Sequence, residues 1–527
     1  MTTTPSPAAR PPAGRKARKP AGQVALVGAG AGDPGLLAVR ALELLSAADL
    51  VVADARVPDA VLARVSPAAE VVRTGPGEAV GSTLVAASRD GRAVVRLLPG
   101  DPFSTDEGPR EADAVVKGKQ RLEVVPGIPT ATAVTAYAGV ALGTPHTVAR
   151  YTESLDWRAL SAAPGPLVLQ LDVADVAKAC SALVEHGRRA DAAVSVTVAG
   201  TTAEQRTVLT SLDAADADTG GMSGEAVLVL GEPVKRAARL GWFESRALYG
   251  WKVLVPRTRD QAGVLSQLLR SHGAIPVEVP TIAVEPPRTP APMERAVKGL
   301  VTGRYLWVAF TSTNAVKAVR EKLEEFGLDA RAFAGVKVAA VGEATAAALV
   351  EFGIQPELVP SGQQSSEGLL ADWAPYDEVF DPMDRVLLPR ADIATDTLIA
   401  GLKDLGWQVD DVTAYRTVRA APPPAETREA LKGGGFDAVL FTSSSTVRNL
   451  VGIAGKPSDS TVLACIGPQT AAAADELGLR VDVLSPRADV PSLVEALAEH
   501  ALERRAQGLA LPGDARRKKA ARAAARP

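Results

Sequence analysis

Short runs rich in valine, leucine and isoleucine alternate along the chain with alanine- and leucine-rich stretches of helical period. The first such runs lie at 24–27, 50–52, 93–97 and 122–125, and the helical stretches between them end near residues such as Gly91 and Gly118. A smaller group of strands and helices follows from 167 to about 234. This alternation predicts an α/β fold with largely parallel sheets.

The second half of the chain contains an internal repeat. The pattern changes near Ser245, and a new strand is expected at 251–255. Three motifs then occur twice in the same order: Val-Pro-Arg at 255–257 and Leu-Pro-Arg at 388–390, Phe-Thr-Ser at 310–312 and 441–443, and Gly-x-x-Thr at 342–345 and 467–470. We therefore predict two similar α/β lobes. Proline-rich segments at 286–292 and 420–424 mark the crossings, which predicts one lobe (285–419) inserted into the other (249–284 plus 420–502).

The composition is that of a folded protein with several domains. At 527 residues the chain exceeds what one hydrophobic core supports, and 46% hydrophobic with 23% charged residues is ordinary for globular proteins. Every long apolar run is interrupted by charge or proline, so we expect no membrane span. Cys180 and Cys465 lie in apolar stretches, which indicates buried thiols in a reducing, cytoplasmic compartment.

Charge restricts the kinds of ligand that the chain attracts. The formal net charge of −3 gives no general attraction to nucleic acid or anionic membranes, so an anionic ligand must be bound locally. Both ends, 1–22 and 503–527, are rich in Ala, Pro or Arg and are expected to be disordered basic arms, for which we do not expect nucleic-acid binding. The domain between the first arm and the boundary is expected to cover 23–245.

The repeated Thr-Ser turns indicate how an anion is bound. Each turn follows an apolar strand and opens a helix, where unpaired backbone N–H groups and the helix dipole favour negative charge. Carboxylated ligands can thus be bound by amides and hydroxyls, with Arg257, Arg390 and Arg448 as further partners. The alternative is that these serines and threonines only cap helices.

These motifs, together with Thr413-Ala414-Tyr415, resemble uroporphyrinogen-III synthase from about 249 to 500. The resemblance implies a bilobed enzyme that takes linear hydroxymethylbilane, loses its hydroxyl as water, inverts ring D and closes the macrocycle. It implies no metal or organic cofactor. The four scattered histidines also lack acidic or cysteine neighbours at ligand spacing.

By this resemblance Tyr415 assists loss of the hydroxyl as a hydrogen-bond donor or general acid; the alternative is a packed tyrosine with a satisfied hydroxyl. Because the bilane cyclises spontaneously, the enzyme acts chiefly by folding it correctly. The residues expected to bind substrate are Arg257, Thr311, Ser312, Asn314, Gly342, Thr345, Arg390, Thr442, Ser443, Ser444, Gly467 and Thr470.

The first half carries glycine turns after two strands. Gly28, Gly30 and Gly32 precede Asp-Pro at 33–34, and Gly-Asp-Pro-Phe stands at 100–103. A bare glycine loop would indicate a dinucleotide site. With Asp54, Val-Pro-Gly at 125–127 and Gly-Thr-Thr-x-x-Gln at 200–205, the set instead resembles the tetrapyrrole methylases over about 23–244, and uroporphyrinogen-III C-methyltransferase above all. The resemblance implies S-adenosylmethionine as cofactor, a homodimer through this domain, and a cofactor site made of Gly28, Gly30, Gly32, Asp33, Pro34, Gly100, Asp101, Pro102, Phe103, Thr130, Ala131 and Gly200.

The sequence departs from this family where the substrate carboxylates are bound. The family's Gly-Asp-Pro-Phe is followed by Phe-Gly-Arg-Gly-Gly-Glu-Glu, whereas here Ser-Thr-Asp-Glu follows at 104–107. The Thr-His-Arg step near 143–146 is also rearranged. Three hypotheses remain open: a bifunctional synthase and methyltransferase acting on hydroxymethylbilane and uroporphyrinogen III for porphyrin, sirohaem and cobalamin synthesis, a synthase with a non-catalytic methylase-like domain, and a tetrapyrrole-binding sensor without turnover.

Overall fold

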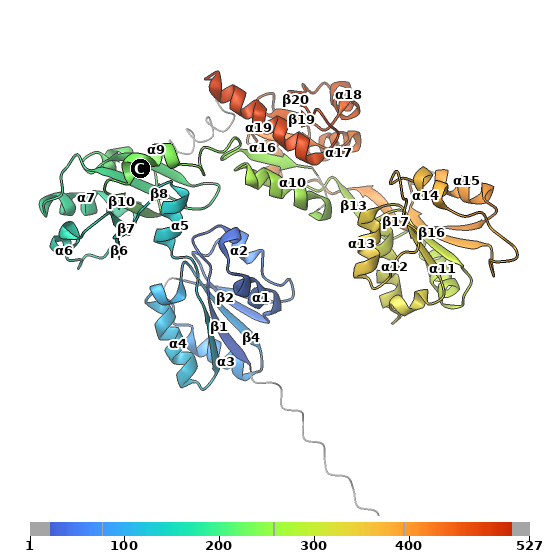
Figure 1. Ribbon diagram of the computed structural model, residues 1–527, viewed down its shortest axis with the longest axis horizontal. Coiled ribbons are helices and arrows are strands. Elements are labelled where there is room, and N and C mark those ends of the chain that lie inside the picture. Colours follow the sequence, from blue (N-terminus) through green and yellow to red (C-terminus); the bar gives the residue numbers. More distant parts are fainter. Residues whose placement is uncertain (1–21, 76, 257–258, 394–395, 509–527) are drawn as a thin grey trace, which may run out of the picture. The chain divides into compact units, whose positions relative to one another are not determined.

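The computed structural model describes residues 22–75, 77–256, 259–393 and 396–508. The chain divides into two compact units, and Figure 1 labels their helices and strands. Unit 1 comprises Met1–Lys252, Leu268–Ile275 and Ala498–Pro527, and unit 2 comprises Val253–Gln267 and Pro276–Leu497. The described strands form four five-stranded sheets.

The first sheet of unit 1 is parallel, in the order β3-β2-β4-β1-β5. Its strands are β1 (Gln23–Gly28), β2 (Leu50–Asp54), β3 (Glu70–Thr74), β4 (Ala93–Leu98) and β5 (Arg121–Val125). Successive side chains bury on opposite faces: Val27 packs with α1 (Val39–Ala47) and α2 (Asp59–Leu62), and Leu26 with α3 (Gly81–Arg89) and α4 (Glu107–Lys117). The four expected strands are confirmed. The edge strand β3 was not predicted, because four of its five residues are exposed and show no apolar pattern.

The second sheet of unit 1 has the order β6-β7-β10-β8-β9. Its strands are β6 (Thr147–Arg150), β7 (Leu167–Asp172), β8 (Ala193–Val198), β9 (Arg206–Ser211) and β10 (Glu225–Leu230). Only β6 and β7 are parallel; the other pairs are antiparallel, a departure from the expected parallel arrangement. Helices cover both faces, α6 (Trp157–Ala162), α7 (Val176–Glu185) and α8 (Ala215–Asp218) on one, α5 (Thr130–Tyr137) and α9 (Val234–Leu240) on the other. Because both faces of the sheet are buried, the central strands are continuous apolar runs in the sequence, and such runs do not show whether neighbouring strands are parallel or antiparallel.

Unit 2 holds the twin lobes, apart from residues 252, 268–275 and 498–506 of the first lobe, which are grouped with unit 1. One sheet has the order β12-β11-β18-β19-β20, from β11 (Lys252–Val255), β12 (Ile275–Glu278), β18 (Ala438–Phe441), β19 (Val462–Cys465) and β20 (Val483–Leu484). The other has the order β13-β17-β16-β14-β15, from β13 (Ile282–Glu285), β14 (Trp307–Phe310), β15 (Lys337–Ala340), β16 (Arg385–Ala391) and β17 (Gln408–Arg419). β13 pairs antiparallel with β17, so residues 282–284 belong to the second lobe and not, as the sequence predicts, to the first.

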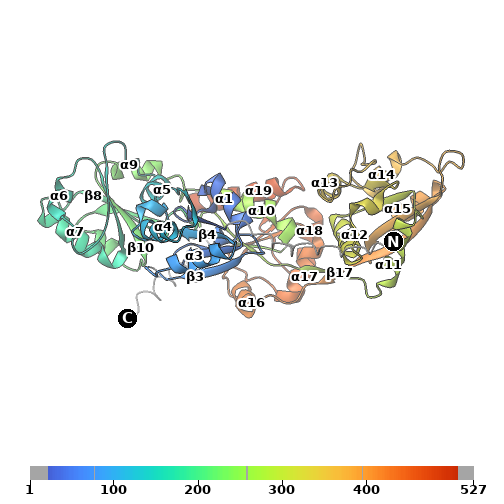
Figure 2. The same cartoon turned by 90° about the horizontal axis from the view of Figure 1, so that it is seen from below.

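Helices pack on both faces of the second lobe's sheet (Figure 2). One face carries α11 (Ala291–Val301), α12 (Thr313–Glu325) and α13 (Glu343–Glu351), and the other α14 (Ser366–Asp372) and α15 (Thr397–Asp404). The first lobe contains α10 (Arg259–Ser271), α16 (Ala425–Lys432), α17 (Ser444–Ala454), α18 (Pro468–Glu476) and α19 (Val490–Ala506). The tail expected from 503 therefore begins inside α19; the first arm, up to residue 21, and residues 509–527 lie outside the described ranges.

The internal repeat is present as a repeated structure. β14 leads through Ser312 into α12 as β18 leads through Ser443 into α17, and β15 leads into α13 as β19 leads into α18. Both cysteines are buried and free, as expected. Within the described ranges, no helix combines the length and apolarity needed to cross a bilayer.

Candidate functional site

Tyr415 lies beside the Thr-Ser turn of the second lobe. Its Oη is 2.9 Å from Oγ of Ser312, which caps α12 by accepting a hydrogen bond from N–H of Ala315 (3.2 Å). Tyr415 is only 7% exposed, and its ring packs in the core between β17 and the helices. Tyr415 is thus a packed tyrosine with a hydrogen-bonded hydroxyl, which is one of the two alternatives that the sequence leaves open. The hydroxyl contacts Ser312, which is itself a predicted site residue.

A cavity of about 370 Å³ opens beside this pair in the second lobe. Tyr415 and Asn314, both predicted site residues, line it. Its further walls include Thr313, Lys317 and Glu321 from α12. The cavity therefore runs from Tyr415 along α12, from Thr313 in its first turn to Glu325 at its end.

The matching turns of the first lobe contact each other. Ser443 and Thr446 form a reciprocal capping box at the start of α17. Ser444 Oγ donates to the carbonyl of Gln469 (2.9 Å), which joins this turn to the one at Gly467, where α18 begins. Capping thus occupies part of the hydrogen-bonding capacity of these serines.

The threonines of the predicted site divide by burial. Thr345 and Thr470 are 6% and 4% exposed, so their side chains lie within the lobes, while Thr311 and Thr442 are half-buried. Gly342 is half-buried at the start of α13, next to the side chain of Gln364. A ligand contact for these residues stays a prediction.

The predicted arginines have other partners. Arg390 Nε lies 2.6 Å from Oδ1 of Asp411 and its Nη2 lies 2.9 Å from Oδ1 of Asp396, with 11% of the side chain exposed. The pKa of Arg390 is raised, chiefly by the hydrogen bond to Asp411. Arg448 pairs with Glu476 at 2.8 Å. Arg257 lies outside the described residues.

In unit 1 the glycine turns meet at the carboxyl ends of the strands. A Cβ on Gly28 would lie 2.4 Å from N of Gly127 and 2.5 Å from O of Gly100, so these glycines permit backbone contact between turns. N–H of Gly100 donates to O of Gly30 (2.8 Å). Gly30 is buried and has φ +68°, and the atoms within 4 Å of its Cβ position belong to Leu36, at 3.9 Å.

Asp33 joins the first glycine turn to the 200–205 motif. It caps the short helix that Pro34 begins, its N–H donates to Oγ1 of Thr201 (3.1 Å), and Tyr137 donates its hydroxyl proton to Asp33 Oδ2 (2.9 Å). Burial and this bond raise the pKa of Tyr137. The Cβ position of Gly32 lies 3.3 Å from O of Gly200, so the two motifs are in contact.

The second glycine turn is held by Asp101. Its carboxylate accepts N–H bonds from Phe103 (3.0 Å) and Gly127 (3.1 Å). Pro102 is buried, whereas Phe103 is 55% exposed. Thr130 Oγ1 lies 3.2 Å from the Cβ position of Gly100, and Ala131 is buried in α5. The predicted cofactor residues are thus gathered around the ends of β1, β4 and β5, except Gly200, which follows β8 and lies beside Gly32.

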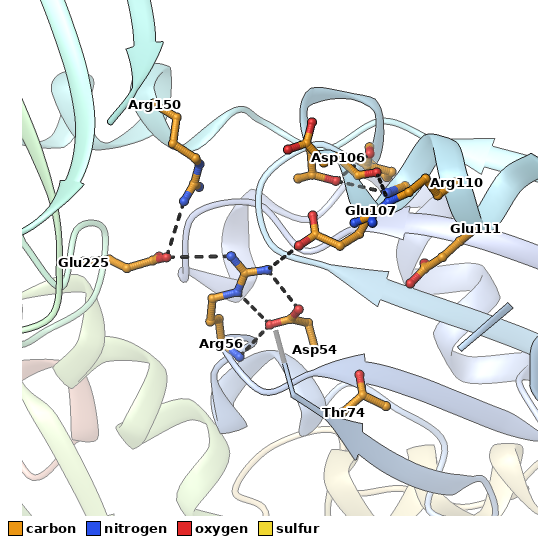
Figure 3. Close-up of polar contacts among 12 residues, drawn as sticks. Asp54, Arg56, Thr74, Asp106, Glu107, Arg110, Glu111, Arg150 and Glu225 are labelled. Atoms are coloured by element: carbon orange, nitrogen blue, oxygen red, sulfur yellow. Dashed lines mark hydrogen bonds and ion pairs between the residues drawn. The ribbon is translucent and has the colours of Figure 1, made fainter. Parts of the chain in front are cut away.

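A group of charged residues nearby was not predicted (Figure 3). Asp54 is fully buried, and its carboxylate accepts hydrogen bonds from Nε (2.8 Å) and Nη2 (2.9 Å) of Arg56. Burial raises the pKa of Asp54, but the bonds from Arg56 outweigh it and hold that pKa below its ordinary value. Arg56 also lies near Glu107 (4.0 Å) and Glu225 (3.7 Å). The only sequence signal was an arginine two residues after Asp54.

Behind this group lies a buried ion pair. Arg96 donates to Glu111 (2.8 Å) and to Thr74 Oγ1 (3.0 Å), with 1% and 7% of the two charged side chains exposed. Burial raises the pKa of Glu111. Among the residues described, no cluster of His, Cys, Asp and Glu side chains is arranged to hold a metal ion.

Two α/β enzyme domains are defined by these features, one with glycine turns around parallel strand ends and one with twin hydroxyl-capped lobes. The family model described as "Tetrapyrrole (Corrin/Porphyrin) Methylases" matches residues 23–216, and that described as "Uroporphyrinogen-III synthase HemD" matches residues 263–495. The chain is a fusion of a tetrapyrrole-methylase domain with a uroporphyrinogen-III-synthase domain.

Two curated relatives match different shares of the chain. The chain is 28% identical over 503 residues to "Porphyrin biosynthesis protein HemD" of Ruminiclostridium josui, covering 91% of this chain and 98% of that protein. It is 34% identical over 242 residues to "Siroheme synthase" of Psychromonas ingrahamii, which covers 42% of this chain and 51% of that protein, so the chain spans about half of that relative. Among solved structures, uroporphyrin-III-C-methyltransferase from Thermus thermophilus aligns with TM-score 0.38 and 28% identity, over 41% of this chain and 98% of that one.

Proposed function

We propose that the protein converts hydroxymethylbilane to uroporphyrinogen III and then methylates that product with S-adenosylmethionine. The two matched families supply consecutive steps, which suits porphyrin, sirohaem and cobalamin synthesis. The observation that carries the synthase assignment is the contact between Ser312 and Tyr415 beside a cavity of the second lobe. Cytoplasmic location and a homodimer stay predictions.

In the synthase step, Tyr415 would donate a hydrogen bond to the departing hydroxyl. Ser312 Oγ accepts a hydrogen bond from Ala315 N–H and can donate one to Tyr415 Oη, which would leave the tyrosine proton for the substrate. The starts of α12 and α17 would bind acetate and propionate arms through N–H groups. Since the bilane cyclises without help, holding it with ring D turned is the main contribution.

In the methylase step, S-adenosylmethionine would supply the transferred methyl group. The residues fit such a cofactor in one respect: the glycine turns at Gly30 and Gly100 pair through their backbones, and the exposed Phe103 follows the second turn. Asp33, Thr201 and Tyr137 fix the shape of the first turn. Gly28, by contrast, serves contact between backbones.

A second candidate keeps the synthase and gives the methylase domain a binding role without methyl transfer. Asp106 and Glu107 favour it, since they stand in the stretch where the family has arginine, and Glu107 lies 4.0 Å from Arg56.

One experiment separates these functions. The full chain is incubated with hydroxymethylbilane, with and without methyl-labelled S-adenosylmethionine, and the type I and type III products are resolved. Type III product carrying label is expected. Type III without label would support the second candidate, and type I alone would refute the synthase.

A further inference from the structure

Arg56 lies among three carboxylates from different parts of unit 1 (Figure 3). Asp54 stands at the end of β2, Glu107 begins α4, and Glu225 is the first residue of β10 in the second sheet. On the far side of Glu225 lies Arg150, the last residue of β6. The ion pairs of this group therefore connect the first sheet of unit 1 to the second.

The bonds of Arg56 are unequal. Its Nε and Nη2 are held by the buried Asp54 at 2.8 and 2.9 Å. Its Nη1 lies 3.7 Å from Oε1 of Glu225, and Nη1 of Arg150 lies 3.7 Å from the same oxygen. Both distances exceed those of a hydrogen bond. One carboxylate oxygen thus lies between two guanidinium groups and is hydrogen-bonded to neither.

The carboxylate of Glu225 is easy to displace because the side chains around it are exposed to solvent. The side chains of Arg150 and Glu225 are 56% and 58% exposed, so their attraction is weakened by solvent and each can change rotamer without burying a charge. An incoming carboxylate that forms short, forked bonds to both guanidinium groups would be bound more strongly than Glu225 is. Exchange of one carboxylate for another leaves the local charge unchanged.

We propose that Arg56 and Arg150 bind one carboxylate arm of an acidic tetrapyrrole, and that Glu225 occupies this place in the free protein and moves out when the ligand binds. The class of ligand, an acidic tetrapyrrole, is taken from the proposed methylase function; the binding place is argued from the contacts above. It explains how a domain with Asp106 and Glu107 in place of the family's arginine stretch still has cations for a polycarboxylate: they come from the loop after β2 and from the end of β6.

The test uses equilibrium dialysis of the full chain against uroporphyrin III, an octacarboxylate, with S-adenosylhomocysteine present. Glu225→Gln removes the competing charge at nearly constant shape and should lower Kd about threefold to tenfold. Arg150→Ala removes one of the two cations from an exposed position and should raise Kd about tenfold. Opposite shifts from these two variants are the expected result.

Matched controls remove the same charges elsewhere in the second sheet's lobe. Glu232→Gln and Arg189→Ala break exposed pairs with Lys235 and Asp191 and should leave Kd unchanged. Equal Kd values for wild type, Glu225→Gln and Arg150→Ala would overturn the proposal, and so would weaker binding in both variants, because Glu225 would then help to hold the ligand. Opposite shifts without methyl transfer would refute the methyltransferase alone; methyl transfer with unchanged Kd values would refute this inference alone.

Discussion

The hydroxyl oxygens of Ser312 and Tyr415 lie 2.9 Å apart although 103 residues separate them in the chain. Ser312 is fixed by its capping bond to Ala315, and Tyr415 by the packing of its ring. Two constraints of different kinds therefore hold one hydroxyl pair, whose tyrosine is among the residues that line the cavity. Such a pair is pre-organised, because neither group must be ordered when substrate binds.

Tyr415→Phe should slow uroporphyrinogen III formation by about tenfold, the modest loss expected where positioning dominates over proton transfer. The released bilane then cyclises on its own, so the share of type I product should rise. Ser312→Ala should give a smaller loss, and the double variant should be little worse than Tyr415→Phe, since both changes remove one shared bond.

The control for this pair is Tyr305→Phe. Tyr305 belongs to the same lobe and donates to Asp410 at 2.9 Å, away from the cavity residues named above. This variant should keep the wild-type ratio of type III to type I product. An unchanged rate and ratio for Tyr415→Phe would mean that the hydroxyl has no part in the reaction.

Arg390→Ala should weaken the fold more than it weakens substrate binding. Its guanidinium is held by Asp411 and Asp396, so removing it leaves carboxylates without their partner and should lower the free energy of unfolding by about 1.5–3 kcal/mol. Asp411→Asn should give a similar loss, and the two losses should not add. Urea unfolding measures this; a tenfold rise in KM for hydroxymethylbilane with unchanged stability would instead support the substrate contact that the sequence predicts.

The Thr-Ser turns could be predicted because their signal is local. An apolar strand, a hydroxyl residue and a helix follow one another within a few positions, and the motif occurs twice at 310–312 and 441–443. The capping of α12 and α17 was therefore foreseeable from the chain alone. The family resemblance added Tyr415, but the contact between its hydroxyl and Ser312 depends on how β17 packs beside α12.

What the sequence missed depends on contacts over long separations. Glu225 meets Arg56 and Arg150 only because two sheets, formed by distant segments, lie together in unit 1. Arg390 looked like a free cation because Asp411, its main partner, is 21 residues away on the neighbouring strand. No periodicity or spacing rule reports such pairs.

Asp54→Asn should destabilise the protein in a pH-dependent way. The pKa of Asp54 in the folded protein lies below its ordinary value of about 3.9, so its charge stabilises the fold above that pH, and the stabilisation is lost as pH falls through the lower, folded pKa. The variant should lose about 1–3 kcal/mol at pH 7, and the difference from wild type should shrink below about pH 4.

Urea unfolding at several pH values from 7 to 3 measures the effect of Asp54. Asp191→Asn is the control: hydrogen bonding to Arg189 lowers the pKa of Asp191 too, but both side chains are exposed, so its loss should be small throughout. A difference between wild type and Asp54→Asn that stays constant down to pH 3 would contradict the assignment, because it would not follow the charge.

Gly28→Ala and Gly30→Ala should separate packing from cofactor binding. A Cβ at Gly28 meets the backbone of Gly127 and Gly100 at about 2.5 Å. We expect a loss of about 1–3 kcal/mol in the free energy of unfolding, because the turns must move apart. At Gly30 a Cβ would contact Leu36 at 3.9 Å without a clash, so chiefly the positive φ opposes it, at about 1 kcal/mol. The same methyl group adds bulk to the turn proposed to hold S-adenosylmethionine, so the Kd of the cofactor should rise at least tenfold.

Calorimetric titration with S-adenosylmethionine and urea unfolding measure the two effects on the same samples. Gly187→Ala is the control, since Gly187 also has a positive φ (+101°) and open space around its Cβ position, and it follows α7 in the second lobe of unit 1. It should match Gly30→Ala in stability and wild type in Kd. If Gly30→Ala binds the cofactor as wild type does, the cofactor does not lie against this turn, and Gly30 serves only the turn between β1 and the helix that Pro34 begins.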